Sequence, residues 1–180
     1  EALVSSEVGE AALADYLRTY EALNARAVVI KARDLETTFG FKISNEDVAA
    51  FCREHGSRYI GFAGVDPNKG MQALRDLEHA VLELGLRGLN VQGFEHRLHI
   101  NDKRMYLIYG KCVELDIPIF VNAGVPGPRV PMACQDVALI DEVCWFFPEL
   151  KLVMRHGAEP WTALAVKLML KWPNLYSSTS

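Results

Sequence analysis

The sequence lacks both the long apolar run of a membrane-spanning helix and the basic block that binds nucleic acid or an anionic membrane. No apolar stretch reaches the roughly 18 residues that a membrane-spanning helix needs, and the longest ones, such as residues 117–123, have the length of one strand. No block of basic residues stands out among 19 Lys and Arg against 23 Asp and Glu, and the formal net charge is −4. Neither nucleic acid nor an anionic membrane is therefore expected as a partner.

The four cysteines form no paired motif. They are scattered without CxxC spacing, and each falls in an apolar periodic segment: Cys52, Cys112, Cys134 and Cys144. This pattern predicts reduced, buried thiols and a cytoplasmic protein. The chain starts at Glu1, with neither an initiator Met nor the basic region of a signal peptide. We therefore expect it to begin partway through a larger protein.

Strand and helix patterns alternate along the whole chain. Helical spacing of apolar residues predicts helices over 8–23, 71–84, 102–115, 135–147 and 160–171, and a further helix capped by Asn45 and ended by Gly56. Asp102 is the expected cap of the helix that it opens, and Pro160 is expected at the first helical position. Short apolar runs predict strands centred near Val28, Gly61, Leu89, Phe120, Val153 and Tyr176. Their spacing of roughly 30 residues is that of a βαβ unit.

Alternation of this kind predicts an α/β protein with a parallel sheet covered by helices. An open doubly wound sheet and a (β/α)8 TIM-type barrel both satisfy it. No GxGxxG motif follows an early strand, as a dinucleotide-binding sheet would require. Six strands are too few for a closed barrel, which takes about 250 residues. The barrel interpretation therefore makes residues 1–180 a single barrel domain that covers about strands 2–7 and is incomplete at both ends.

Polar residues follow the predicted strands directly, where function collects in either architecture. His156 is the strongest candidate among them, because it ends a buried strand and precedes Gly157, which indicates close approach of backbone or ligand. A histidine there can bind a metal or take up a proton near neutral pH. For the other strand-end residues, solvation of the rim and helix capping remain the plainer interpretation.

Other catalytic motifs are missing or weak. His96 and His99 are spaced i, i+3, but no HExxH pattern accompanies them, and the segment 94–100 reads as a loop that covers substrate rather than a metal site. His55 and His79 are expected at the surface. The segment 124–128 is too rich in proline to cradle phosphate, and no GxSxG elbow appears.

Four segments together resemble the amidohydrolase-related family, in the branch that contains aminocarboxymuconate-semialdehyde decarboxylase. They are residues 61–67 (GFAGVDP), 84–89 (LGLRGL), 117–124 (IPIFVNAG) and 148–157 (PELKLVMRHG). The resemblance runs from about residue 11 to residue 180. It implies a (β/α)8 barrel with a divalent metal, most often zinc, at the carboxyl ends of the strands.

The resemblance also implies roles for individual residues. Family members bind metal through an HxH pair on the first strand, a His ending the fifth and an Asp ending the eighth. His156 matches the sixth-strand histidine, which acts as acid/base or activates water, whereas Asn122 stands where the fifth-strand His ligand is usual. His156 and Asn122 are the only matched positions, so the metal ligands are otherwise unknown.

Two functions follow as hypotheses. The first is a metal-dependent hydrolase or decarboxylase of a small carboxylated or cyclic organic acid, with Arg155 and Arg33 holding the carboxylate and Gln92 and Asn122 orienting the substrate. A salt bridge to Glu159 is the plainer expectation for Arg155. The second is a catalytically degenerate or metal-free barrel that binds a ligand or a partner. A homodimer through residues 145–147 and Trp161 is possible, although burial in the core is the favoured interpretation of these side chains.

Overall fold

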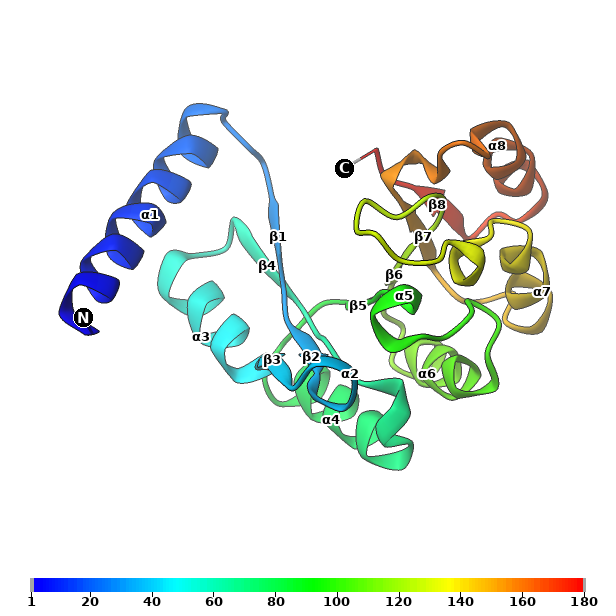
Figure 1. Cartoon of the computed structure of the whole chain (residues 1–180), viewed down its shortest axis with the longest axis horizontal. Coiled ribbons are helices and arrows are strands. Elements are labelled where there is room, and N and C mark those ends of the chain that lie inside the picture. The colour runs from blue at the N-terminus through cyan, green and yellow to red at the C-terminus, as the bar shows by residue number, and fades with distance from the viewer. Residues whose placement is uncertain (1, 180) are drawn as a thin grey trace.

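Six parallel strands form one curved, open arc (Figure 1). The computed structural model describes residues 2–179, with side chains from residue 11 onward. The strands of the arc follow one another in chain order: β1 (Val28–Lys31), β4 (Tyr59–Phe62), β5 (Leu89–Val91), β6 (Ile119–Asn122), β7 (Leu152–Arg155) and β8 (Leu175–Ser177). A parallel bridge between Ala63 and Leu89 joins the β1–β4 pair to the other four strands. The backbone N–H of Asn90 donates to the Ala63 carbonyl across that junction at 2.8 Å.

Helices connect the strands and cover one face of the arc, as βαβ units require. The covering helices are α3 (Asn45–His55), α4 (Met71–Leu82), α6 (Lys103–Glu114), α7 (Leu139–Phe146) and α8 (Thr162–Lys171), and α1 (Ala2–Ala22) precedes β1. After β1 the chain forms a hairpin of β2 (Arg33–Leu35) and β3 (Phe41–Ile43) around the short helix α2 (Glu36–Phe39). A second short helix, α5 (Gly93–His96), follows β5, and 3-10 turns occupy Pro67–Lys69, Ala133–Gln135 and His156–Ala158.

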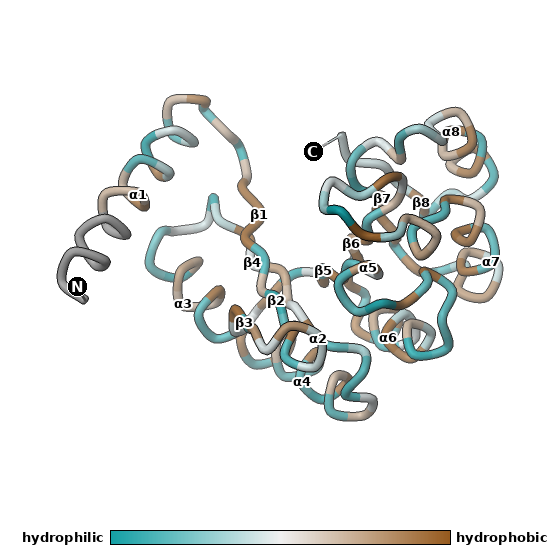
Figure 2. The backbone as a smooth tube through the Cα atoms, in the orientation of Figure 1, coloured by the Kyte–Doolittle hydropathy of each residue, from teal (hydrophilic) through white to brown (hydrophobic). Residues whose placement is uncertain are grey.

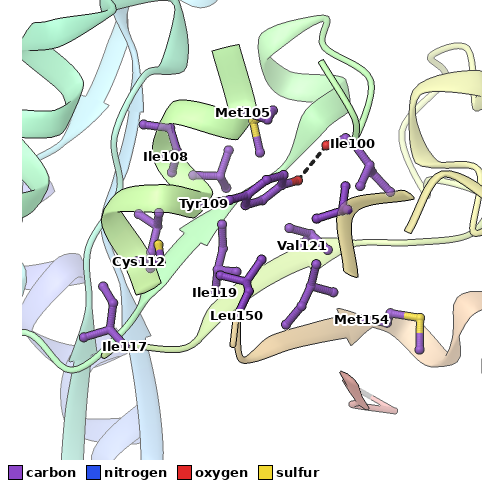
Figure 3. Close-up of a cluster of buried hydrophobic side chains, with 14 of the residues drawn as sticks. Ile100, Met105, Ile108, Tyr109, Cys112, Ile117, Ile119, Val121, Leu150 and Met154 are labelled. Atoms are coloured by element: carbon purple, nitrogen blue, oxygen red, sulfur yellow. Dashed lines mark hydrogen bonds between the residues drawn. The ribbon is translucent and has the colours of Figure 1, made fainter. Parts of the chain in front are cut away.

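The core lies between the strands and their covering helices. Alternate strand residues point into it, so Leu152 and Met154 are fully buried whereas Val153 between them is only partly buried. Figure 2 shows hydrophobic residues along β1 and β7. In the part of the core drawn in Figure 3, the fully buried Tyr109 of α6 donates its hydroxyl to the Ile100 carbonyl at 2.7 Å. This bond satisfies the one polar atom that the tyrosine brings into the core.

The expected strands and helices are confirmed, but several of their ends differ. Ser44, not Asn45, caps α3, because its side chain accepts from the Asp47 backbone N–H at 3.0 Å. Asn45 lies inside the helix and accepts instead from the Gly64 N–H. The expected helix over 135–147 is a 3-10 turn followed by α7. Pro160 follows a cis peptide bond and is not the first helical residue, since α8 begins at Thr162.

Two expectations about burial are wrong in part. Cys112 and Cys144 are buried, but Cys52 and Cys134 are partly exposed, and all four are free thiols. Phe147, which follows the last residue of α7, packs against the core as expected. Trp145 and Phe146 before it do not, because they are 73% and 60% exposed. No helix within residues 2–179 is long and apolar enough to cross a membrane.

Candidate functional site

Polar residues from several strands meet at the carboxyl end of the arc, which we call the mouth. Its members are Lys31 at the end of β1, Arg33 at the start of β2, Asn122 at the end of β6, Arg155 at the end of β7, and His156. Asn122 and Arg155 are direct register partners in neighbouring parallel strands. Partners of this kind point to the same face of a sheet, and this is the face opposite the core residues Val121 and Met154.

Arg155 is buried without an acidic partner. Its side chain is 8% exposed, and Nη1 donates to Oδ1 of Asn90, two strands away, at 3.4 Å. The salt bridge expected with Glu159 does not form, and among residues 11–179 no carboxylate pairs with Arg155. Burial, and then the positive charge of Arg33, lowers the pKa of Arg155. The fold therefore holds this guanidinium charge in an unfavourable place.

Two further cations lie close to Arg155. Partial burial lowers the pKa of Lys31, and the charges of Arg155 and Arg33 lower it further. Arg33 forms an ion pair through Nη2 with the buried Glu95, while its buried Nε has no hydrogen-bond partner among the described residues. Among residues 11–179, Arg33 is therefore the one member of this trio that is paired with a carboxylate. Such a surplus of positive charge in a partly buried site favours an anionic ligand.

Two amide side chains complete the polar lining. Asn122 is 5% exposed, and its Oδ1 is a buried acceptor without a donor in the described structure. A buried amide oxygen that is left unpaired costs free energy, so Asn122 is poised to accept from a ligand. Gln92 follows β5 at the start of α5 and is 9% exposed, and its side chain does not cap that helix.

His156 stands on an unusual turn at the rim of the mouth. Three successive residues have left-handed backbone angles: His156 (φ 63°), Gly157 (φ 65°) and Ala158 (φ 58°). Left-handed angles are costly for residues with a Cβ, and they cluster at functional sites. The turn is anchored next to the end of the neighbouring strand β8, since the Gly157 N–H donates to the Ser178 carbonyl at 3.0 Å. No described part of the protein approaches Gly157 closely, since a Cβ there would meet nothing within 4 Å, and its left-handed angle explains the glycine. The expected close approach of a ligand stays a prediction.

The imidazole of His156 is exposed and lines a cavity of about 340 Å³ with Glu159, Thr162 and Thr179. Partial burial, and then the positive charges of Arg155 and Lys31, lowers the pKa of His156 below its usual 6.5. The ring is therefore neutral at physiological pH, and it can accept a proton from a bound ligand or a water molecule.

The buried pair of Asp66 and His96 was missed from the sequence. The expected loop at His96 is the helix α5, in which His96 is 3% exposed, with Nδ1 3.3 Å from Oδ1 of the fully buried Asp66. Burial raises the pKa of Asp66, but hydrogen bonds from Thr37 and Asn68 and the nearby His96 outweigh it and lower that pKa. The position of Asp66 after a strand indicates a residue of possible function. Nothing in the sequence spacing, however, pairs Asp66 with His96, which lies 30 positions later.

A metal centre is not complete within residues 11–179, where no group of three or more His, Cys, Asp or Glu side chains could hold an ion. His96 and His99 do not form such a site, because His96 is buried against Asp66 while His99 is exposed. Asn122 and His156 offer two donors, fewer than the three or four protein ligands that such sites usually have. The positive charges of Lys31, Arg33 and Arg155 around them also oppose a divalent cation, so the residues present do not fit a metal ion by themselves.

Comparison with known proteins identifies the family. A family model for amidohydrolases matches residues 8–180. The chain belongs to this amidohydrolase family. The curated 2-amino-3-carboxymuconate-6-semialdehyde decarboxylase of Dictyostelium discoideum is 21% identical to this amidohydrolase, over 63% of this chain and 36% of that protein. The resemblance seen in the sequence is therefore confirmed.

Solved structures confirm the TIM-barrel fold. An uncharacterized TIM-barrel protein from Bordetella bronchiseptica matches with a TM-score of 0.78 and 24% identity, over 90% of this chain and 58% of that one. A 5-carboxyvanillate decarboxylase from Novosphingobium aromaticivorans, complexed with manganese, matches with a TM-score of 0.57 and 17% identity, over 71% of this chain and 42% of that one. The amidohydrolase chain thus spans between about a third and three fifths of the length of these relatives. The assignment of its six strands to positions 2–7 of one incomplete barrel domain stays a prediction.

Proposed function

We propose that this amidohydrolase chain supplies the carboxylate-binding part of an enzyme that acts on a small carboxylated or cyclic organic acid. One observation carries the proposal: Lys31, Arg33 and Arg155 gather at the mouth, and within residues 11–179 only Arg33 is paired with a carboxylate, that of Glu95. A substrate carboxylate supplies the missing negative charge. Guanidinium groups bind carboxylates through charge-assisted, often bidentate hydrogen bonds.

Each mouth residue has a role in this proposal. Arg155 holds the substrate carboxylate, with Arg33 as a second donor through its unpartnered Nε. Asn122 accepts a hydrogen bond from a substrate hydroxyl, and Gln92 orients the same molecule. Neutral His156 transfers a proton to or from the carbon or oxygen at which the reaction occurs.

Decarboxylation, a carbon–carbon lyase reaction, is the favoured chemistry over hydrolysis. Several similar proteins are named as decarboxylases of carboxylated acids, among them the muconate-semialdehyde enzyme and a 2,6-dihydroxybenzoate decarboxylase. A 4-oxalomesaconate hydratase with a TM-score of 0.55 is also similar. In a decarboxylase the leaving carboxylate becomes CO₂ and a proton replaces it on carbon. Neutral His156 takes that proton from a substrate hydroxyl or a water molecule and passes it to the carbon.

A divalent metal ion is the second part of the proposal. Two similar structures contain manganese, and the earlier preference for zinc stays a prediction. Asn122 and His156 are the residues of this chain that would contribute donors, with further ligands required. Because Lys31, Arg33 and Arg155 oppose a divalent cation at this place, the proposal assigns the ion no step in the reaction. A cytoplasmic location and a homodimer likewise stay predictions.

Turnover of carboxylated aromatic acids by the full-length protein tests the proposal. The substrates are 2,6-dihydroxybenzoate, 5-carboxyvanillate and a muconate-like dicarboxylate, with CO₂ release and ultraviolet absorbance as readouts. We expect turnover of at least one acid, with a loss of about 100-fold or more in His156→Gln if it transfers the proton. Unchanged turnover in His156→Gln would remove this role.

Elemental mass spectrometry of the same protein, purified without chelator or added metal, tests the metal. About one manganese, zinc or similar ion per chain supports the metal-dependent enzyme. The absence of metal, together with no turnover of any acid, would instead support the degenerate barrel that the asparagine at position 122 motivates.

A further inference from the structure

Two adjoining cavities extend from the mouth across the loops that follow β1, β5 and β6. One has a volume of about 420 Å³ and the other of about 510 Å³. Both are lined by Phe39 of α2, Phe94 of α5 and Val130 of the loop after β6. Because they share these three lining residues, the two cavities adjoin, and we call them together the loop groove.

The loop groove is charged at its ends and apolar between them. The first cavity includes Arg33 and Glu95, so the groove opens at the cationic mouth. At the far end lie the exposed Arg97 and His99. Between these ends the wall is apolar apart from the thiol of Cys134, and it includes Leu35, Phe39, Phe41, Phe94 and Val130.

The exposure of Phe39 indicates that no other side chain of the described structure fills the groove. Its side chain is 58% exposed, and Phe41 beside it is 46% exposed. Exposed aromatic side chains that line a concave surface of a few hundred Å³ are typical of small-molecule sites. The cations at both ends select for an acid over a neutral lipid or an apolar peptide.

We propose that the loop groove holds the apolar ring or chain of an organic acid whose carboxylate is bound by Arg33 and Arg155. The inference rests on the proposed function for the carboxylate, and it adds the shape of the substrate. An acid with an extended apolar body fills the groove, whereas a single-ring acid reaches only the mouth. Arg97 and His99 then face the end of the ligand that is remote from the reacting carboxylate.

Calorimetric titration with two acids tests the inference. The probes are benzoate and biphenyl-4-carboxylate, which share the carboxylate and differ by one ring. We expect the biphenyl acid to bind at least about tenfold more tightly, because its second ring leaves water. Equal affinity of the two acids would overturn the groove.

Three variants define where the preference arises. Phe39→Ala removes an exposed wall and Ala133→Trp fills the far cavity, and neither position is buried. Each variant should reduce the ratio of the two affinities, biphenyl-4-carboxylate to benzoate, to about threefold or less. The affinity for benzoate itself should stay unchanged. Phe146→Ala, the matched control, removes an exposed ring of α7 outside the groove and should change neither acid. A preference that survives Phe39→Ala and Ala133→Trp contradicts the inference.

The variant Arg155→Met separates failure of the groove from failure of the carboxylate site. One outcome is that Arg155→Met binds both acids more weakly while the wild type shows no preference for biphenyl-4-carboxylate over benzoate. That outcome supports the carboxylate site and rejects the groove. Unchanged binding of both acids in Arg155→Met rejects the carboxylate site. If Phe39→Ala then still abolishes the preference, the groove binds apolar rings without that anchor, and the substrate pose proposed above is wrong.

Discussion

Replacing Arg155 with methionine should separate ligand binding from stability. Arg155 is 8% exposed, and burial and the charge of Arg33 lower its pKa. Lys31 also lies nearby, and the guanidinium donates a 3.4 Å hydrogen bond to Asn90. Methionine keeps much of the length of the side chain and removes the charge. The variant therefore tests whether the charge serves the fold or the ligand.

The structure gives opposite signs for the two effects. Loss of a charge-assisted hydrogen bond to a bound carboxylate costs about 1.5–3 kcal/mol, a roughly 10- to 150-fold rise in Kd. For the folded protein, the long bond to Asn90 is worth about 0.5–1.5 kcal/mol. Relief of a buried, unpaired charge is worth several kcal/mol. The free energy of unfolding is therefore expected not to fall.

Arg104 provides the matched control. It is an exposed arginine whose Nε and Nη2 each donate to the Asp102 carboxylate at 2.9 Å, and these bonds lower the pKa of Asp102 to about 2. Arg104→Gln should lower stability slightly at neutral pH and leave ligand affinity unchanged. Titration calorimetry with benzoate and thermal melts of both variants are the assays. An Arg155→Met variant that unfolds more easily yet binds benzoate like wild type would refute the reasoning.

Four further substitutions test residues that support the site. Gly124→Ala should lower the free energy of unfolding by at least about 2 kcal/mol, and Gly157→Ala by only about 1 kcal/mol. The reason is that a Cβ at Gly124 would lie 2.4 Å from the Glu159 carbonyl oxygen, whereas a Cβ at Gly157 would meet nothing within 4 Å. Equal losses of the two variants in urea melts would contradict this difference. Burial lowers the pKa of His96 below 6.5, so the unfolded chain binds the proton more readily and stability should decline as pH falls below 6.5. His96→Gln should flatten that part of the pH profile, and an unchanged slope would exclude His96 as its source. Tyr109→Phe should cost about 1–2 kcal/mol by leaving a buried carbonyl unpaired, as chemical denaturation would show.

The strand and helix order was predictable because its signals are local. Runs of three apolar residues, 119–121 and 152–154, mark β6 and β7, and the Asp102 cap is confirmed by its bond to the Arg104 N–H at 2.9 Å. Ends were less predictable where neighbouring polar residues compete for one role. Ser44 and Asn45 are both good caps, and a contact with the distant Gly64 decides that Ser44 takes the role.

The site was predictable only as far as strand ends reveal it. Asn122 and His156 were found because each directly follows an apolar strand. The partner of Arg155 was not, since the sequence offers the nearby Glu159 whereas the parallel register brings Asn90 within reach. The loop groove was also hidden, because its shared walls come from three loops far apart in the sequence.

Comparing benzoate with benzamide most directly tests the carboxylate-binding mouth. The two molecules share a ring and differ in charge, so titration calorimetry of the wild-type chain isolates the contribution of the carboxylate. We predict that benzoate binds at least about tenfold more tightly at low salt, and that the difference shrinks as added salt screens the charges. Equal affinities at low salt would contradict a mouth in which Lys31, Arg33 and Arg155 bind an anionic substrate.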